Sequence, residues 1–89
     1  MFKYGYYPAT FEDYKEIRSR RKSKNFVKGD KVVGLDEMPY GCTSGIVGGT
    51  VADFDGYFVT IDYSNGNSFH QINIPYNDVR KLKKGEEFA

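Results

Sequence analysis

Six basic side chains lie within eleven residues near the start of the chain, and their types and spacing suggest phosphate binding. Arg presents a planar fork of N–H donors and Lys a compact charge, and both neutralise nucleic-acid phosphates. The alternative is a solvated helix end whose cations only complement the helix dipole. The predicted phosphate contacts are Arg18, Arg20, Arg21, Lys22, Lys24 and Lys28.

Aromatic and acidic side chains form a second candidate group. The predicted strands direct Phe58 and Phe69 outward from an otherwise polar face, with Tyr57 at its rim. Exposed rings stack nucleobases, enclose a methylated cation or anchor a protein partner, unless a helix packs over them. The carboxylates of the same region either face a basic protein or belong to ordinary turns. The predicted partner-binding residues are Tyr40, Phe58, Phe69, Asp36 and Asp62.

The remaining reactive side chains do not form a catalytic or metal-binding set. The chain has one cysteine and one histidine, too few for a structural zinc site, and we expect an incidental thiol at Cys42 and a core imidazole at His70. Asp53 and Asp55 flank a predicted turn and not a cleft, so they do not indicate acid–base catalysis. We therefore expect a protein that is not an enzyme and has no catalytic residue, metal or cofactor.

The charge is divided along the chain, although the formal total for 89 residues is only +1. Residues 15–31 hold eight basic and two acidic side chains, whereas residues 32–79 hold six acidic ones and no Lys or Arg. This asymmetry predicts two faces of opposite sign, each with its own partner. Alternatively, the basic segment folds onto the acidic body and the charges satisfy each other.

The sequence has no feature of a membrane or secreted protein. No apolar run approaches the roughly 18 residues of a membrane-spanning helix. Residues 1–10 lack the pattern of a signal peptide, and a single cysteine cannot form an internal disulfide. We expect a cytoplasmic protein without a membrane partner, and we leave its oligomeric state open.

Residues 10–24 are predicted to form a basic helix. Thr10 is a suitable N-cap, and acidic side chains in the first turns with basic ones in the last complement the helix dipole. Phe11, Tyr14 and Ile17 form an apolar stripe at helical spacing. This stripe is too narrow for a central core helix and suits a helix that lies over the two outward phenylalanines.

From residue 26 onward the hydrophobic period changes to two, and turn signals recur at strand spacing. Hairpin turns are predicted at Asp55-Gly56 and Asn65-Gly66, and Pro75 begins a tight or 3-10 turn before the last strand. The predicted strands span residues 31–35, 45–54, 57–63, 67–74 and 79–82. A two-residue loop at Asn65-Gly66 then places on the core face the pairs Ile61 with His70, Val59 with Ile72, and Tyr57 with Ile74.

Two motifs resemble parts of known small barrels. The run Ile-Pro-Tyr-Asn-Asp-Val at 74–79 resembles the Pro-x-Asn-x-Val end of SH3-type domains. Gly29-Asp30 before the first barrel strand, with the glycine-rich run at 44–51, resembles the opening of KOW and Tudor-like SH3 barrels. The resemblance covers about residues 27–83 and implies a five-stranded SH3-like barrel.

Barrels of this type bind RNA, DNA, ribosomal or transcription partners, or methylated side chains, and many small proteins of this build come from phages and bacteria. Peptide-binding SH3 domains grip polyproline with a Trp, which this chain lacks, so that activity is not expected. The basic helix is not part of these barrels.

The sequence therefore predicts a mainly β protein: an SH3-like barrel at residues 26–84, a basic helical extension at 1–25 and a tail at 85–89. The predicted function is a nucleic-acid or ribonucleoprotein adaptor that contacts DNA or RNA phosphates without sequence preference. The alternative is a protein–protein interaction factor, such as a phage-type inhibitor or modulator of a host enzyme.

Overall fold

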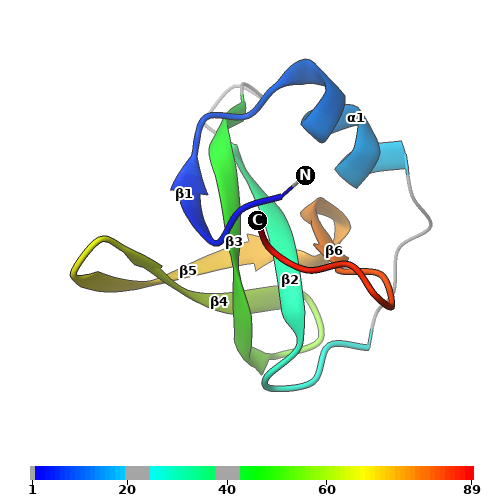
Figure 1. Cartoon of the computed structure of the whole chain (residues 1–89). Coiled ribbons are helices and arrows are strands. Elements are labelled where there is room, and N and C mark those ends of the chain that lie inside the picture. Colours follow the sequence, from blue (N-terminus) through cyan, green and yellow to red (C-terminus); the bar gives the residue numbers. More distant parts are fainter. Residues whose placement is uncertain (1, 20–24, 38–42) are drawn as a thin grey trace.

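A computed structural model describes residues 2–19, 25–37 and 43–89, and this part of the chain is mainly β (Figure 1). One antiparallel sheet of six strands is accompanied by a short helix and a 3-10 turn. The elements are β1 (Gly5–Tyr7), α1 (Phe11–Ser19), β2 (Lys31–Glu37), β3 (Thr43–Phe54), β4 (Phe58–Asn65), β5 (Ser68–Pro75), η1 (Tyr76–Asp78) and β6 (Val79–Lys81).

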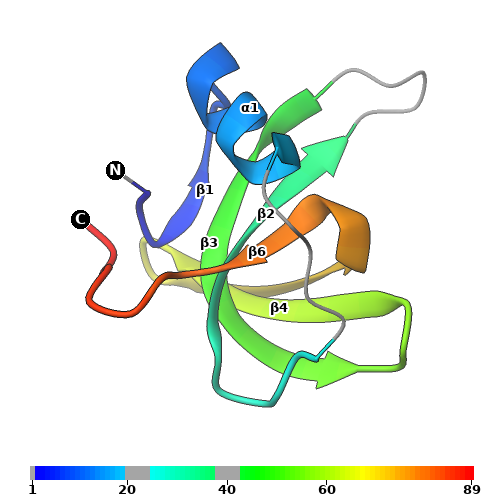
Figure 2. The same ribbon diagram turned by 90° about the vertical axis from the view of Figure 1, so that its right-hand side faces the viewer.

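The long strand β3 joins the two halves of the sheet. The strand order is β5-β4-β3-β2-β6, and β1 pairs with the first half of β3. Most of β3 pairs with β2, and its last residues pair with β4. The β3–β4 ladder shifts between Val51 and Asp53, an irregularity of the kind that bends a strand. Strands β4 and β5 therefore run across β2 and β3 (Figures 1 and 2).

Two apolar clusters lie on opposite faces of β2 and β3, because successive side chains of a strand point to opposite sides. Val32 and Val47 belong to the first cluster, whereas Val33 and Ile46 belong to the second. The first cluster draws on β2 to β6 and on the segment before β2. Its buried members are Phe26, Val32, Val47, Val51, Val59, Ile61, Ile74 and Val79.

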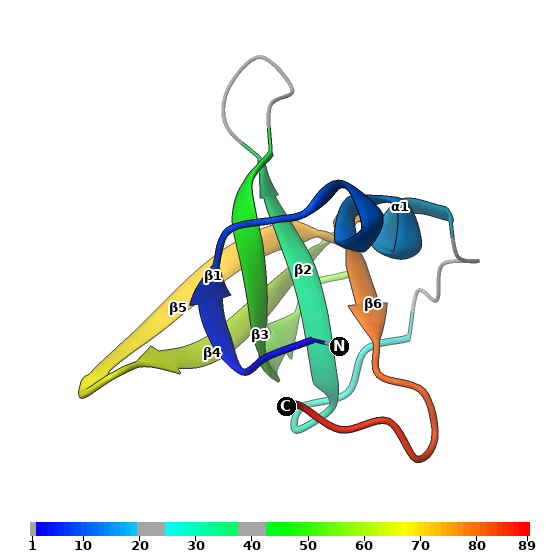
Figure 3. The ribbon, with the colours of Figure 1, turned by 45° about the horizontal axis from the view of Figure 1, so that its top comes forward.

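The second cluster is covered by α1 and by both terminal segments. Ile17 of α1 is fully buried and Phe2 is almost fully buried. Phe88 packs against the same cluster, and the Ala89 N–H donates to the Phe2 carbonyl oxygen at 2.9 Å. Consequently the two ends of the described chain lie close together over β2 and β3 (Figures 1 and 3).

The prediction for the helix is confirmed in its first part. The Asp13 N–H donates to Thr10 Oγ1 at 3.1 Å, as expected of an N-cap, and the helix continues to Ser19. Residues 20–24 lie outside the described residues. Within the predicted stripe, Ile17 is buried but Phe11 is 76% exposed.

The prediction that this helix covers Phe58 and Phe69 is wrong. Ile17 packs against Val33 and Leu35 in the second cluster, and α1 contacts β2 and η1. The two phenylalanines belong to β4 and β5 and remain exposed. The helix docks on the outer face of β2 and β3 because Val33, Leu35 and Ile46 form an apolar surface there that buries Ile17.

All five predicted strands form, with small changes at their ends, and η1 is the predicted 3-10 turn. The turn before β4 also forms: Asp55 Oδ1 accepts the N–H groups of Tyr57 and Phe58 at 2.9 and 2.8 Å, and these bonds lower the pKa of Asp55. The sixth strand, β1, was not predicted.

The predicted register of the β4–β5 hairpin is wrong. The turn residues are Gly66 and Asn67, so Asn65 pairs with Ser68. Gly66 has a φ of +67°, which favours glycine at this place. The core pairs are therefore Ile61 with Ile72 and Val59 with Ile74, and His70 moves opposite Tyr63.

Candidate nucleic-acid interface

The two basic segments of the sequence meet where β2 begins and β6 ends. Strands β2 and β6 are antiparallel neighbours, with Val32 opposite Lys81. The Leu82 N–H extends this ladder by donating to the Lys31 carbonyl oxygen at 3.0 Å. Lys31, the first residue of β2, and Lys83, two residues after the end of β6, are both exposed at this junction.

A tight turn holds the segment that enters β2. The Asp30 N–H donates to the Val27 carbonyl at 3.0 Å, and Asp30 Oδ2 accepts the Val27 N–H at 2.9 Å. Gly29 has a φ of +97° and donates its N–H to the Val51 carbonyl at 2.8 Å. Lys28 is exposed at this turn, so its charge is presented to solvent.

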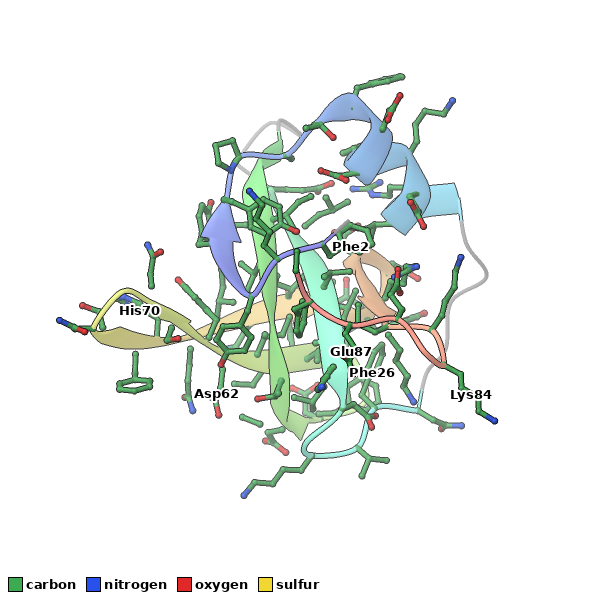
Figure 4. The ribbon with its side chains drawn as sticks, viewed as in Figure 1. Phe2, Phe26, Asp62, His70, Lys84 and Glu87 are labelled. Carbon is green, nitrogen blue, oxygen red and sulfur yellow. The ribbon has the colours of Figure 1, made fainter. Side chains whose placement is uncertain are left out.

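The segment after β6 forms a second turn. The Lys83 N–H donates to Glu86 Oε1 at 2.9 Å, and the Glu86 N–H donates to the Lys83 carbonyl at 2.9 Å. Lys84 lies in this turn and projects away from the sheet (Figure 4). We call Lys28, Lys31, Lys83 and Lys84 the lysine edge.

A shallow depression of about 270 Å³ separates the two turns. Both charged and uncharged residues contribute to its surface. It is lined by Gly29, Asp30, Lys31, Lys81, Leu82, Lys83 and Glu86.

The carboxylates of the depression are already neutralised by cations of the fold. Lys81 Nζ lies 3.4 Å from Asp30 Oδ2 and 5.5 Å from the centre of the Phe26 ring. Arg80 Nη1 lies 3.1 Å from Glu86 Oε1. Among the described residues the ion pairs do not include Lys28, Lys31, Lys83 or Lys84, although the Lys83 charge helps to lower the pKa of Glu86.

Two of the six predicted phosphate contacts can be placed. Lys28 is part of the lysine edge, whereas Arg18 is held within the fold. Arg18 Nη2 pairs with Glu37, its Nε lies 2.9 Å from Asp78 Oδ1, and its guanidinium lies over the Tyr14 ring. The other four, Arg20, Arg21, Lys22 and Lys24, lie outside the described residues.

Three lysines of this edge, Lys31, Lys83 and Lys84, were not among the predicted phosphate contacts. The available signal was the predicted barrel, because a first barrel strand that pairs with the last one would bring both basic segments to one edge. Phosphate contact by these lysines needs no base-specific group.

Phe58 and Phe69, two of the predicted partner-binding residues, have exposed rings, as expected of side chains on the outward face. Phe58 is 43% exposed and its ring lies 4.7 Å from that of Tyr57. Phe69 is 87% exposed near the end of the β4–β5 hairpin. Asp62 is half-buried beside Phe69 in a depression of about 440 Å³ that Tyr4 also lines.

The other two predicted partner-binding residues differ in how far they can be placed. Tyr40 lies outside the described residues. Asp36 Oδ2 accepts the Tyr6 hydroxyl at 2.6 Å, so this carboxylate helps to hold β1 beside β2 and β3.

The prediction of a core position for His70 is wrong. His70 is exposed and its ring stacks on Tyr63 at 5.3 Å, on the opposite side of the hairpin from Asp62 (Figure 4). Cys42 lies outside the described residues. In the ranges that the structure describes, no three His, Cys, Asp or Glu side chains are grouped so that they would hold a metal ion.

No protein-family model, curated protein or solved structure matches this chain. The described part of the chain holds no helix with the length and apolar character that a membrane crossing needs. The candidate interface therefore rests on the chemistry of its own residues.

Proposed function

We propose that this chain is a small non-enzymatic nucleic-acid-binding module with an SH3-like barrel. The barrel is supported by the antiparallel succession β2 to β5, by the 3-10 turn η1 before the last strand and by the pairing of β6 with β2. These features accompany the sequence motifs that resemble SH3-type domains.

The observation that carries the proposed function is the lysine edge. Lys31 and Lys83 line one depression, Lys28 and Lys84 are exposed in the turns beside it, and hydrogen bonds of the main chain hold both turns. Such lysines neutralise backbone phosphates of DNA or RNA and release counterions. Lysine ammonium groups contact phosphates and not base edges, so the binding is independent of nucleotide sequence and strongly dependent on salt.

Fluorescence anisotropy with a labelled DNA duplex and a labelled RNA strand tests the proposal. Four neutralised phosphates on duplex DNA predict a roughly hundredfold loss of affinity between about 50 and 200 mM salt. The variant Lys31→Gln/Lys83→Gln is expected to lower the affinity about tenfold at low salt and to flatten the salt dependence.

The matched control is Lys3→Gln/Lys15→Gln, which removes the same charge from exposed positions outside the lysine edge. It should lower the affinity much less. Equal losses in the two variants would contradict a site at the lysine edge. Absence of binding at low salt would end the proposal.

The exposed β4–β5 rings favour a second candidate, a protein–protein interaction factor such as a modulator of a host enzyme. Phe58 and Phe69 lie in the stretch of chain that has no Lys or Arg, and aromatic anchors with a negative surround suit a basic protein partner. A stoichiometric complex that survives nuclease treatment and is lost in Phe58→Ala supports this candidate. A complex that disappears with the nucleic acid contradicts it.

A further inference from the structure

Strand β5 presents an unpaired edge in the described structure. It lies at one end of the strand order and pairs along its whole length with β4, from Ser68 to Pro75. Its other side has no ladder with any described strand. A strand edge of this kind exposes a row of N–H and C=O groups that can pair with another strand.

The β5 edge lacks the features by which edges are usually protected. Residues 68–75 include no Lys, Arg, Asp or Glu, and the only proline is the last of them. The β4–β5 ladder has no register shift that would twist the edge away. By contrast, β1 and β6 are only three residues long.

The position of the hairpin makes the edge accessible. The β4–β5 hairpin extends beyond the rest of the molecule, away from α1 and the two chain ends (Figures 1 and 3). Residues 65–71 are all exposed, and the Phe69 ring is 87% exposed on this projection. A second strand can therefore approach the first half of β5, residues 68–71, without meeting the body of the protein.

We propose that β5 pairs antiparallel with β5 of a second copy and forms a symmetric dimer with one continuous sheet. Because β5 has no Lys, Arg, Asp or Glu, two copies of this strand meet without like-charge repulsion, and this favours a second copy as the partner. A strongly basic or acidic strand would find no complementary charge on β5 itself. A two-fold axis through the pair makes the contact close on itself and buries the Phe69 ring of each copy near the new seam. This pairing is independent of the lysine edge and of the proposed function.

Sedimentation velocity from low micromolar to millimolar concentration tests the dimer. The unaltered chain is expected to change from monomer to dimer over this range. Phe69→Lys/Gln71→Lys places four cations along the seam of a dimer and should raise the dissociation constant at least about tenfold. Both side chains are exposed, so the variant should retain its circular dichroism spectrum and thermal midpoint.

The matched control is Phe11→Lys/Val27→Lys, which adds the same charge at exposed positions of α1 and of the segment before β2, away from β5. It should leave the dissociation constant within about threefold, since added charge alone acts weakly through solvent. Amide hydrogen exchange in residues 68–74 should slow as the protein concentration rises. A monomer at every concentration would overturn the proposal. A dimer that both variants weaken equally would also overturn it, and so would a dimer in which the amide exchange of β5 does not change.

Discussion

At the scale of single residues, Arg80 belongs to the basic C-terminal segment of the sequence, but its side chain is used for contacts within the fold. Its side chain is 5% exposed, and its guanidinium contacts Glu86 at 3.1 Å, Glu16 at 3.3 Å and the Phe2 ring at 5.0 Å. These partners come from the C-terminal segment, α1 and the N-terminal segment. Arg80 therefore joins three separate parts of the chain and is unavailable to a phosphate.

Replacement of Arg80 by Ala should destabilise the protein by about 2 kcal/mol, because it removes the cation that Glu16 and Glu86 share and the packing of the guanidinium on Phe2. This is below the usual cost of breaking a fully buried pair, since Glu16 and Glu86 are partly exposed. Urea denaturation followed by circular dichroism measures the change.

Lys81→Ala is the control for this prediction. Its partner Asp30 and its own side chain are each about one-third exposed, and such a pair contributes less than about 1 kcal/mol. Equal losses for Arg80→Ala and Lys81→Ala would contradict the special position of Arg80.

Glu86 makes the closure of the C-terminal segment sensitive to acid. Partial burial opposes its ionisation, but the Lys83 N–H and the Arg80 guanidinium outweigh burial and lower the pKa of Glu86. A carboxyl group with a lowered folded-state pKa stabilises the fold at neutral pH, and this contribution is lost as the pH falls through that pKa.

The thermal midpoint of the unaltered protein should therefore fall between neutral pH and about pH 3, the region in which carboxylates titrate. Glu86→Gln should be less stable at neutral pH and should lose less on acidification, because it cannot be protonated. Thermal melts of both proteins at the two pH values measure the difference. A variant that loses as much as the unaltered protein would show that Glu86 has no part in the acid response.

At the scale of elements, the hydrophobic periodicity predicted which segments form strands, but the turn pattern predicted the wrong register for the β4–β5 hairpin. The two-residue turn moved by one position because Gly66, and not Asn65, takes the first place in it. That change left each β4 side chain on its predicted face and moved its partners by two residues. The short strand β1 was missed because three residues carry too little pattern, and it is held by pairing with β3.

The docking of α1 should depend on Ile17 and not on Phe11. Ile17 is fully buried against β2, so Ile17→Ala should cost about 2–4 kcal/mol. Phe11 is 76% exposed, so Phe11→Ala should change the stability by less than about 0.5 kcal/mol. Urea titrations of the two variants compare these values directly. Comparable losses would mean that Phe11 also packs against the body of the protein.

At the scale of the whole molecule, β2 and β3 form a shared wall between two apolar clusters. Val32 and Val47 belong to one cluster, and Val33 and Ile46 belong to the other. A change in the position of β2 or β3 therefore disturbs both clusters. The described structure therefore joins the terminal segments to the sheet in one packed unit.

This arrangement predicts a single cooperative unfolding transition. Val59→Ala in the first cluster and Ile46→Ala in the second should each lower the stability by about 1–4 kcal/mol. Both variants should keep coincident transitions by circular dichroism and tyrosine fluorescence. Separate transitions in Ile46→Ala would show that α1 and the terminal segments unfold on their own.

The sequence by itself determined the strand segments, the capped helix start, the outward direction of Phe58 and Phe69 and the division of charge along the chain. These follow from local periodicity, turn chemistry and composition, which act between near neighbours. Only the tertiary structure decided that Arg18 is paired with Glu37 and Asp78, that α1 covers the second cluster, and that Lys31 meets Lys83. Those outcomes depend on which apolar faces meet across long separations in sequence, and that competition is resolved by packing the whole chain at once.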